Sequence, residues 1–142
     1  MNSEVMFSSK TDEWSTPQDL FDRLNEEFHF DLDVCANESN HKCPLYYDPS
    51  QDGLKMPWEG HIVWCNPPYG REIAKWVEKA YSEHQTHGIT IVMLLPARTD
   101  TKWFHYYVYG QAEIRFLKGR LKFGGCKDNA PFPSMLAIYN IR

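Results

Sequence analysis

The sequence feature that most limits the possible folds of this chain is a pair of adjacent prolines that follows an apolar run. Residues 61–65 have the composition of a short buried strand, and the sequence Asn-Pro-Pro-Tyr follows directly at residues 66–69. Because proline lacks the N–H group that a regular element needs, the strand must end there. An amphipathic helical pattern over residues 71–84 and an apolar run over residues 89–95 come next. Strand, turn, helix and strand in this order predict a parallel βαβ unit.

Further patterns extend this unit to a complete α/β domain. Thr16 is a predicted helix N-cap, with Pro17 at the first position of a helix that runs to about His29. The 25 residues after Val34 are rich in Asn, Pro, Asp and Gly, which predicts a long connection without regular structure. Additional predicted elements are strands over 30–34, 113–117 and 134–141 and a helix over 101–109. We therefore predict a three-layer α/β fold with a mostly parallel sheet and room for an antiparallel hairpin at its end.

The length of 142 residues suits one domain over residues 14–142, preceded by a polar N-terminal arm over residues 1–13 that we expect to be flexible. Any reading of a macromolecular substrate must then be done by loops. No apolar run reaches the roughly 20 residues of a membrane helix, and the first residues lack the pattern of a secretory signal. We expect a cytoplasmic protein without a membrane partner. The four cysteines lack a close paired spacing, so no metal site is expected.

The net charge of -4 argues against general binding of nucleic acids, which requires many cationic side chains. The distribution of the charges along the chain is more informative. One stretch, residues 115–127, contains no acidic residue and is the best candidate to face phosphates. A solvated hairpin with alternating basic side chains explains it equally well. Arg98, just past the strand over 89–95, either faces a phosphate or forms a surface salt bridge. The basic residues of the stretch are Arg115, Lys118, Arg120, Lys122 and Lys127.

Residues 66–69, which follow the strand over 61–65, have groups that could bind and activate an amine. Ligands of open α/β sheets bind beyond the carboxyl ends of the strands. Pro67 and Pro68 force extended dihedrals there, so the Asn66 side-chain oxygen and the Pro67 carbonyl are predicted to be rigid acceptors. Two acceptors that take both hydrogens of a conjugated amine favour a tetrahedral nitrogen whose lone pair can attack an electrophile, while Tyr69 offers a ring for stacking. The alternative is that these residues simply end a strand.

The chain from about residue 14 to residue 141 resembles the small phage and prophage DNA N6-adenine methyltransferases (Dam-like). Besides residues 66–69, the resemblance rests on Trp14–Pro17, Phe30–Ala36, Asp52–Leu54, Leu95–Thr101 and Gly119–Phe123. It implies a reduced, Rossmann-like class I methyltransferase fold and S-adenosylmethionine as methyl donor. It further implies DNA as partner, with an adenine in a short sequence context that is flipped from the duplex or single-stranded. Protection from host restriction is one biological purpose consistent with this resemblance.

The resemblance also implies roles for individual residues. Asp33 and Ala36 are expected to contact the methionine portion of S-adenosylmethionine, and Thr16 and Pro17 to close over it. Asp52 is expected to meet the adenine amino group of the cofactor, with Leu54 against its ring. The remaining implied residues are the catalytic Asn66, Pro67, Pro68 and Tyr69 and the DNA-facing Arg98, Arg120, Lys122 and Lys127.

Simpler roles remain open for several of these residues: Asp33 and Asp52 also suit turns, and Thr16 with Pro17 also suits a helix cap. The chain has Ala36-Asn37 where larger enzymes of the class have glycines, and Asn37 is expected to supply a left-handed turn. For the function, the alternatives are methylation of an RNA adenine or a protein glutamine, and a DNA-binding protein without catalysis.

Overall fold

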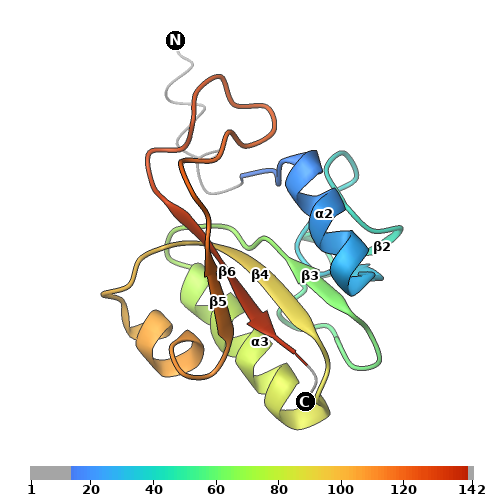
Figure 1. Ribbon diagram of the computed structural model, residues 1–142. Helices are drawn as coiled ribbons and strands as arrows, with labels where there is room; N and C mark the ends of the chain where they lie inside the picture. Colours follow the sequence, from blue (N-terminus) through green and yellow to red (C-terminus); the bar gives the residue numbers. More distant parts are fainter. Residues whose placement is uncertain (1–13, 141–142) are drawn as a thin grey trace.

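The computed structural model describes residues 14–140, and the arm expected over residues 1–13 lies outside them. Within this range six strands form one sheet (Figure 1). The strands are β1 (Leu32–Asp33), β2 (Leu45–Tyr46), β3 (Val63–Cys65), β4 (Ile91–Pro96), β5 (Glu113–Phe116) and β6 (Ser134–Tyr139). The helices are α2 (Gln18–Phe28), α3 (Ile73–His87) and the π-helix η1 (Phe104–Val108).

The sheet is mixed, with the strand order β2-β1-β3-β4-β6-β5. The pairs β1–β2, β1–β3 and β3–β4 are parallel. Strand β6 is antiparallel to both β4 and β5, so the other strands of the described chain share one direction. The predicted βαβ unit is β3-α3-β4, and the hairpin expected at the end is β5–β6. The prediction of an α/β fold is confirmed, with the parallel strands forming part of a mixed sheet.

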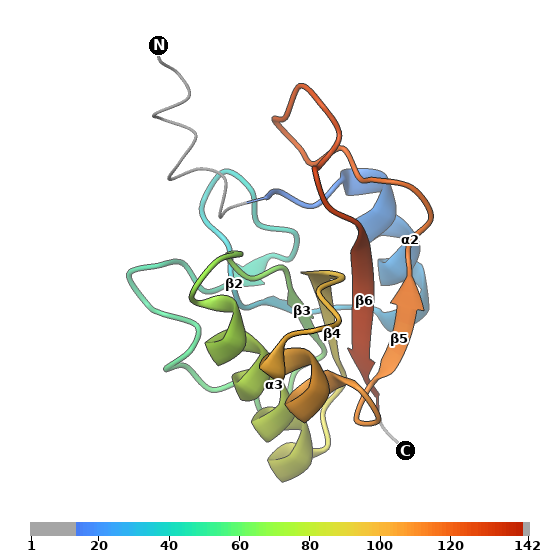
Figure 2. The same cartoon turned by 90° about the vertical axis from the view of Figure 1, so that its left-hand side faces the viewer.

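Helices cover both faces of this sheet. All residues of β4 and β6 are buried, and since alternate strand residues face opposite sides, neither face of these strands is open to water. Figure 2 shows α2 behind the sheet and α3 with η1 in front of it. On the α2 side, the Phe21 ring lies 5.5 Å from the Trp64 ring and 5.6 Å from the Phe30 ring, measured between centroids. The observed arrangement has the three layers that the sequence predicted.

The start of α2 differs from the prediction. Pro17 occupies the N-cap position and no side chain caps the helix. The Thr16 hydroxyl accepts a hydrogen bond from the distant Asn66 instead. The assignment of Thr16 as N-cap is therefore wrong, because a tertiary partner takes the oxygen that a local cap would use.

One other element was missed, and one predicted helix has a hydrogen-bond pattern that the sequence did not reveal. Strand β2 lies within the connection that we expected to lack regular structure; it is two residues long, too short to show an alternating pattern. The helix expected over 101–109 is the π-helix η1, in which the Tyr109 N–H donates to the Phe104 carbonyl at 2.8 Å. Over five residues, side-chain periodicity does not separate this hydrogen-bond pattern from an α-helix. No helix of the described residues is long and apolar enough to cross a membrane.

Candidate active site

A cavity of about 310 Å³ lies at the carboxyl ends of β1 and β3. The chain continues from β1 to β2 on one side and places β3 on the other, so the strand order reverses at this point. The loops that leave the two strands diverge there and leave a crevice, which is where α/β sheets bind their ligands. The volume is within the usual range for small-molecule sites. The strand order itself therefore creates the candidate site.

The cavity brings together residues that lie far apart in the sequence, from Thr16 through Leu54 and Asn66 to Trp76, all of which line it. The predicted site residues in its wall are Thr16, Asp33, Ala36, Asp52, Leu54, Asn66 and Pro68. The predicted site residues outside the wall are Pro17, Pro67, Tyr69, Arg98, Arg120, Lys122 and Lys127.

Asp33 supplies the most deeply buried acidic group of the cavity, with 3% of its surface exposed. Its carboxylate accepts hydrogen bonds from the backbone N–H groups of Lys42 at 2.9 Å and Cys35 at 3.3 Å. Burial nevertheless raises the pKa of Asp33 to about 6, against the lowering effect of these hydrogen bonds. A charge held at such a cost favours a cationic ligand, which would offset the loss of hydration.

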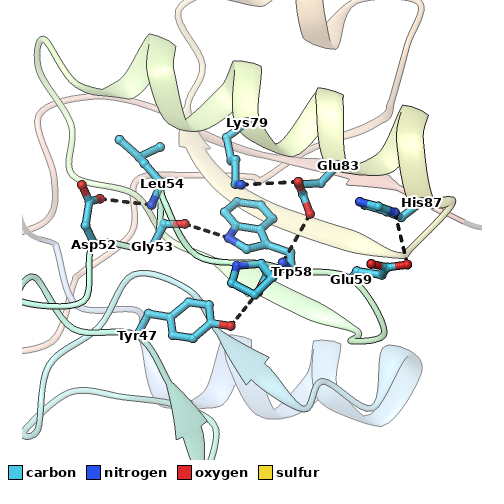
Figure 3. A network of polar contacts seen from close by, with 10 residues as sticks. Tyr47, Asp52, Gly53, Leu54, Trp58, Glu59, Lys79, Glu83 and His87 are labelled. Atoms are coloured by element: carbon cyan, nitrogen blue, oxygen red, sulfur yellow. Dashed lines mark hydrogen bonds and ion pairs between the residues drawn. The ribbon is translucent and has the colours of Figure 1, made fainter.

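The loop over residues 52–54 forms another wall of the cavity, and hydrogen bonds within the loop and from Trp58 hold it in place. Asp52 has a left-handed backbone with φ 61°, and its carboxylate accepts from the Leu54 N–H at 3.1 Å. The Trp58 indole donates to the Gly53 carbonyl at 2.9 Å. Figure 3 shows the Trp58 indole beside this loop, with Glu83 accepting from the Trp58 backbone N–H. These bonds fix Asp52 and Leu54 at the cavity.

Asn66 has a fixed carboxamide. Its Nδ2 donates to the Thr16 hydroxyl at 3.0 Å and to the Trp14 carbonyl. Its Oδ1 is buried and has no hydrogen-bond partner among residues 14–140. An unpaired buried acceptor is costly, and in a native protein it marks a place where a donor is missing. Because Oδ1 is closed to solvent here, a substrate amine can reach it only after neighbouring groups move.

Tyr69 does not present an open ring. It is 4% exposed, and its hydroxyl donates to the Leu94 carbonyl at 3.1 Å. Burial raises the pKa of the phenol well above its ordinary value, so Tyr69 remains neutral. The edge of its ring packs against Phe123 and Phe132, with centroids 6.3 and 5.5 Å away. Stacking of Tyr69 on a base stays a prediction, and it would require this packing to open.

The predicted DNA-facing residues share one edge of the molecule. Arg98 follows β4, and the loop between β5 and β6 (residues 117–133, the β5–β6 loop) begins at the same edge, because β4 and β5 run in the same direction. Arg98, Arg120 and the lysines of this loop are exposed and have no acidic partner in the described part of the chain. Arg115 differs, since Glu27 binds its guanidinium through two hydrogen bonds of 2.8 Å and Glu113 through one of 2.7 Å. Arg115 therefore does not belong to the exposed cations at this edge that have no acidic partner within residues 14–140.

Several features of the site could not be read from the sequence. Trp76 is a core residue with 6% of its surface exposed, and it also lines the cavity. Asn37 has no positive φ, so the expected left-handed turn is wrong; its carboxamide instead accepts from the N–H groups of Ser39 and Asn40. Trp14 reaches the cavity from a segment far from residue 66 in sequence. Within residues 14–140 no cluster of His, Cys, Asp and Glu could hold a metal ion.

Comparison with known proteins agrees with the resemblance seen in the sequence. The family described as DNA N-6-adenine-methyltransferase (Dam) matches residues 3–137. The DNA N-6-adenine-methyltransferase of Haemophilus phage HP1 (strain HP1c1) is 35% identical over 139 residues, which cover 92% of this chain and 80% of that protein. The DNA N-6-adenine-methyltransferase of Escherichia phage T1 is 38% identical over 112 residues, which cover 78% of this chain and 46% of that protein. The chain belongs to the DNA N-6-adenine-methyltransferase (Dam) family.

Proposed function

We propose that the cavity binds S-adenosylmethionine and that its methyl group passes to N6 of an adenine in DNA held beside Asn66. The observation that carries this proposal is the buried, unpaired Oδ1 of Asn66, a residue that lines a cavity at the switch point of the sheet. The strand order and the two covered faces are compatible with a reduced, Rossmann-like class I methyltransferase fold.

The composition of the cavity suits this cofactor. S-adenosylmethionine carries positive charge on its sulfur and its amino group, and the cavity offers the carboxylates of Asp33, Asp52 and Glu72. The cofactor also carries a purine, which needs apolar contacts, and Leu54 and Trp76 supply them. We assign Asp33 to the amino group because it is the most buried of these carboxylates. In this arrangement Ala36 flanks the methionine portion.

The residues at the end of β3 would prepare the acceptor. When bound, S-adenosylmethionine supplies an electrophilic methyl group on a positively charged sulfur. Asn66 Oδ1 would accept one hydrogen of the adenine amine, and the Pro67 carbonyl, which accepts no hydrogen bond within the described residues, would accept the other. With both hydrogens held by these acceptors, the N6 lone pair would be free to take the methyl group that the cofactor supplies, which would leave the sulfur neutral, and N6 would release one proton to water. No ionisable side chain is needed for this transfer.

An adenine can reach these acceptors only outside the base stack. Flipping it from a duplex costs on the order of a few kcal/mol, and a single-stranded adenine avoids that cost. The exposed cations Arg98, Arg120, Lys122 and Lys127 lie at the edge where β3 ends, and we assign them to the phosphates. Since recognition would rest on loops, we expect a short sequence context.

The direct test is incubation of the purified protein with tritiated S-adenosylmethionine and unmethylated duplex DNA, followed by nucleoside analysis. We expect label in N6-methyladenine. Parallel incubations with RNA and with protein provide the alternative acceptors. Label in one of those and none in DNA would contradict the proposed acceptor. DNA binding without measurable binding of S-adenosylmethionine would instead indicate a non-catalytic DNA-binding protein.

Cofactor affinity is expected to fall as the pH drops below 6, because the ionised form of Asp33 attracts the amino group of the ligand. The pKa of this carboxyl is raised to about 6, so it is mostly ionised at pH 7 and mostly protonated at pH 5. A ligand that requires the ionised form should then bind roughly tenfold more weakly at pH 5 than at pH 7. Calorimetric titration across this range measures the effect, and the ligand amine stays charged throughout.

The control is Asp33→Asn, which removes the titrating group and keeps the size of the side chain. This variant should bind the cofactor weakly at pH 7 and show a flat profile between pH 5 and pH 7. A flat profile in the unchanged protein would contradict the assignment of Asp33 to the amino group.

Replacing Arg120 and Lys122 together by alanine should raise the KM for DNA and make its dependence on salt less steep. Each lost phosphate contact removes about 0.9 from the slope of log affinity against log salt, so we expect a change of roughly 1–2. Arg23→Ala is the matched control, because Arg23 is an exposed cation on α2. An equal change of slope in both variants would refute a specific role for the β5–β6 loop.

A further inference from the structure

The short segment before α2, Trp14–Thr16, contacts Asn66, although the two are about 50 residues apart in the sequence. The two hydrogen bonds that Asn66 Nδ2 donates join it to residues 52 and 50 positions earlier in the sequence. Thr16 is 4% exposed, so water does not readily replace its hydroxyl in this contact. Both N–H groups of the carboxamide are thus occupied by this one segment.

The segment is itself held by the β5–β6 loop. The Gly124 N–H donates to the Ser15 carbonyl at 2.9 Å, and these two residues form an isolated antiparallel bridge. The Trp14 ring packs edge-on against Phe123 and Phe132, each with its centroid 5.3 Å away. Figure 1 shows the start of the described chain passing beneath this loop. The contacts with Asn66 therefore come from an anchored segment.

The direction of the carboxamide decides whether Asn66 can serve as an acceptor. Turning the group by half a rotation exchanges Oδ1 and Nδ2 at almost no steric cost, and would present N–H groups to the hydrogens of an amine. Two acceptors on the Nδ2 side, the Trp14 carbonyl and the Thr16 hydroxyl, favour one of the two directions. That direction leaves Oδ1 unpaired.

We propose that Thr16 is a positioning residue, which together with the Trp14 carbonyl orients Asn66 so that Oδ1 faces the incoming amine. This inference rests on the proposed function, and it gives Thr16 a role other than closing over the cofactor. Because the segment is tied to the β5–β6 loop, the orientation of Asn66 is also linked to the loop that carries Arg120 and Lys122.

The test is Thr16→Val, which keeps the shape of the side chain and removes the hydroxyl. We expect kcat for DNA methylation to fall about tenfold, while the Kd for S-adenosylmethionine changes by less than about twofold, as loss of one orienting hydrogen bond would give. Thr16→Ser restores a hydroxyl and should recover most of the lost kcat. Thr86→Val is the matched control, because Thr86 is exposed on α3 and does not line the cavity.

The measurements separate this role from its alternatives. A raised cofactor Kd with unchanged kcat in Thr16→Val would assign Thr16 to the cofactor and overturn the inference. Failure of Thr16→Ser to recover kcat, or an equal loss in Thr86→Val, would overturn it as well. Melting temperatures of all variants reveal whether a loss of kcat reflects unfolding. If the unchanged protein methylates no adenine in the same assay, the proposed function fails, whereas full activity of Thr16→Val alone refutes only the positioning role.

Discussion

Asn66→Ala is expected to lower kcat for methyl transfer by at least about 10²-fold, the usual effect of removing one preorganised group that stabilises a transition state. The alanine side chain cannot accept a hydrogen from the adenine amine, so the nitrogen lone pair stays delocalised into the ring. Binding of S-adenosylmethionine should change little, because the cofactor contacts are assigned to Asp33, Asp52 and Leu54. Single-turnover kinetics with labelled cofactor measure the rate, and calorimetry measures the binding.

The matched control for this variant is Asn140→Ala. Asn140 follows β6, which ends at the opposite edge of the sheet from the cavity, and its carboxamide accepts a hydrogen bond from Thr90 at 2.9 Å. We expect a modest loss of stability and an unchanged kcat. If Asn66→Ala abolished cofactor binding, the assignment of Asn66 to the adenine amine would be refuted.

Gly53→Ala is expected to disrupt the cavity and to weaken cofactor binding by more than tenfold. A Cβ atom at this position would lie 2.0 Å from the Val34 carbonyl oxygen and 2.9 Å from the Trp76 ring. The first contact involves backbone, so either the loop over residues 52–54 or the end of β1 must shift. Because the Trp58 indole holds the Gly53 carbonyl, a shift would also break that bond (Figure 3). Overpacking of this kind typically costs about 1–3 kcal/mol of unfolding free energy.

Gly110→Ala separates the effect on binding from the effect on stability. Gly110 has φ 78°, and a Cβ there would meet no atom within 4 Å. Alanine in this left-handed conformation costs about 1–2 kcal/mol, comparable with the loss in Gly53→Ala. Thermal unfolding and calorimetry of both variants should show two destabilised proteins, of which one has lost cofactor affinity. Normal affinity in Gly53→Ala would show that the loop does not form a wall of the cofactor site.

The sequence predicted most of the fold because the main elements have strong local patterns. The α3 periodicity and the apolar runs of β4 and β6 require burial on a sheet, whatever the remainder of the chain does. The prolines after β3 end that strand for a covalent reason. The short strand β2 was missed, and the π type of η1 was not foreseen, because a few residues do not show a period.

The candidate site divides in the same way. Asp33, Asp52 and Asn66 were named from the sequence, and the structure places all three in one cavity. The pairing of Arg115 with Glu27 could not be predicted from the sequence, since the two residues are 88 positions apart. The same applies to the contact of the Thr16 hydroxyl with Asn66, because a local helix cap and a cofactor contact were the predicted roles of Thr16.

By itself the sequence determined the strand that ends just before Asn66, the α/β class and the resemblance to the adenine methyltransferases. These depend on covalent geometry and on periodic burial, both of which are local properties. Only the tertiary structure decided which way the Asn66 carboxamide points, that Tyr69 is packed within an aromatic cluster, and that Asp33 holds its charge at a cost. The reason is that hydrogen-bond partners and burial depend on chain segments that meet only after folding, and the pattern around a residue does not reveal them.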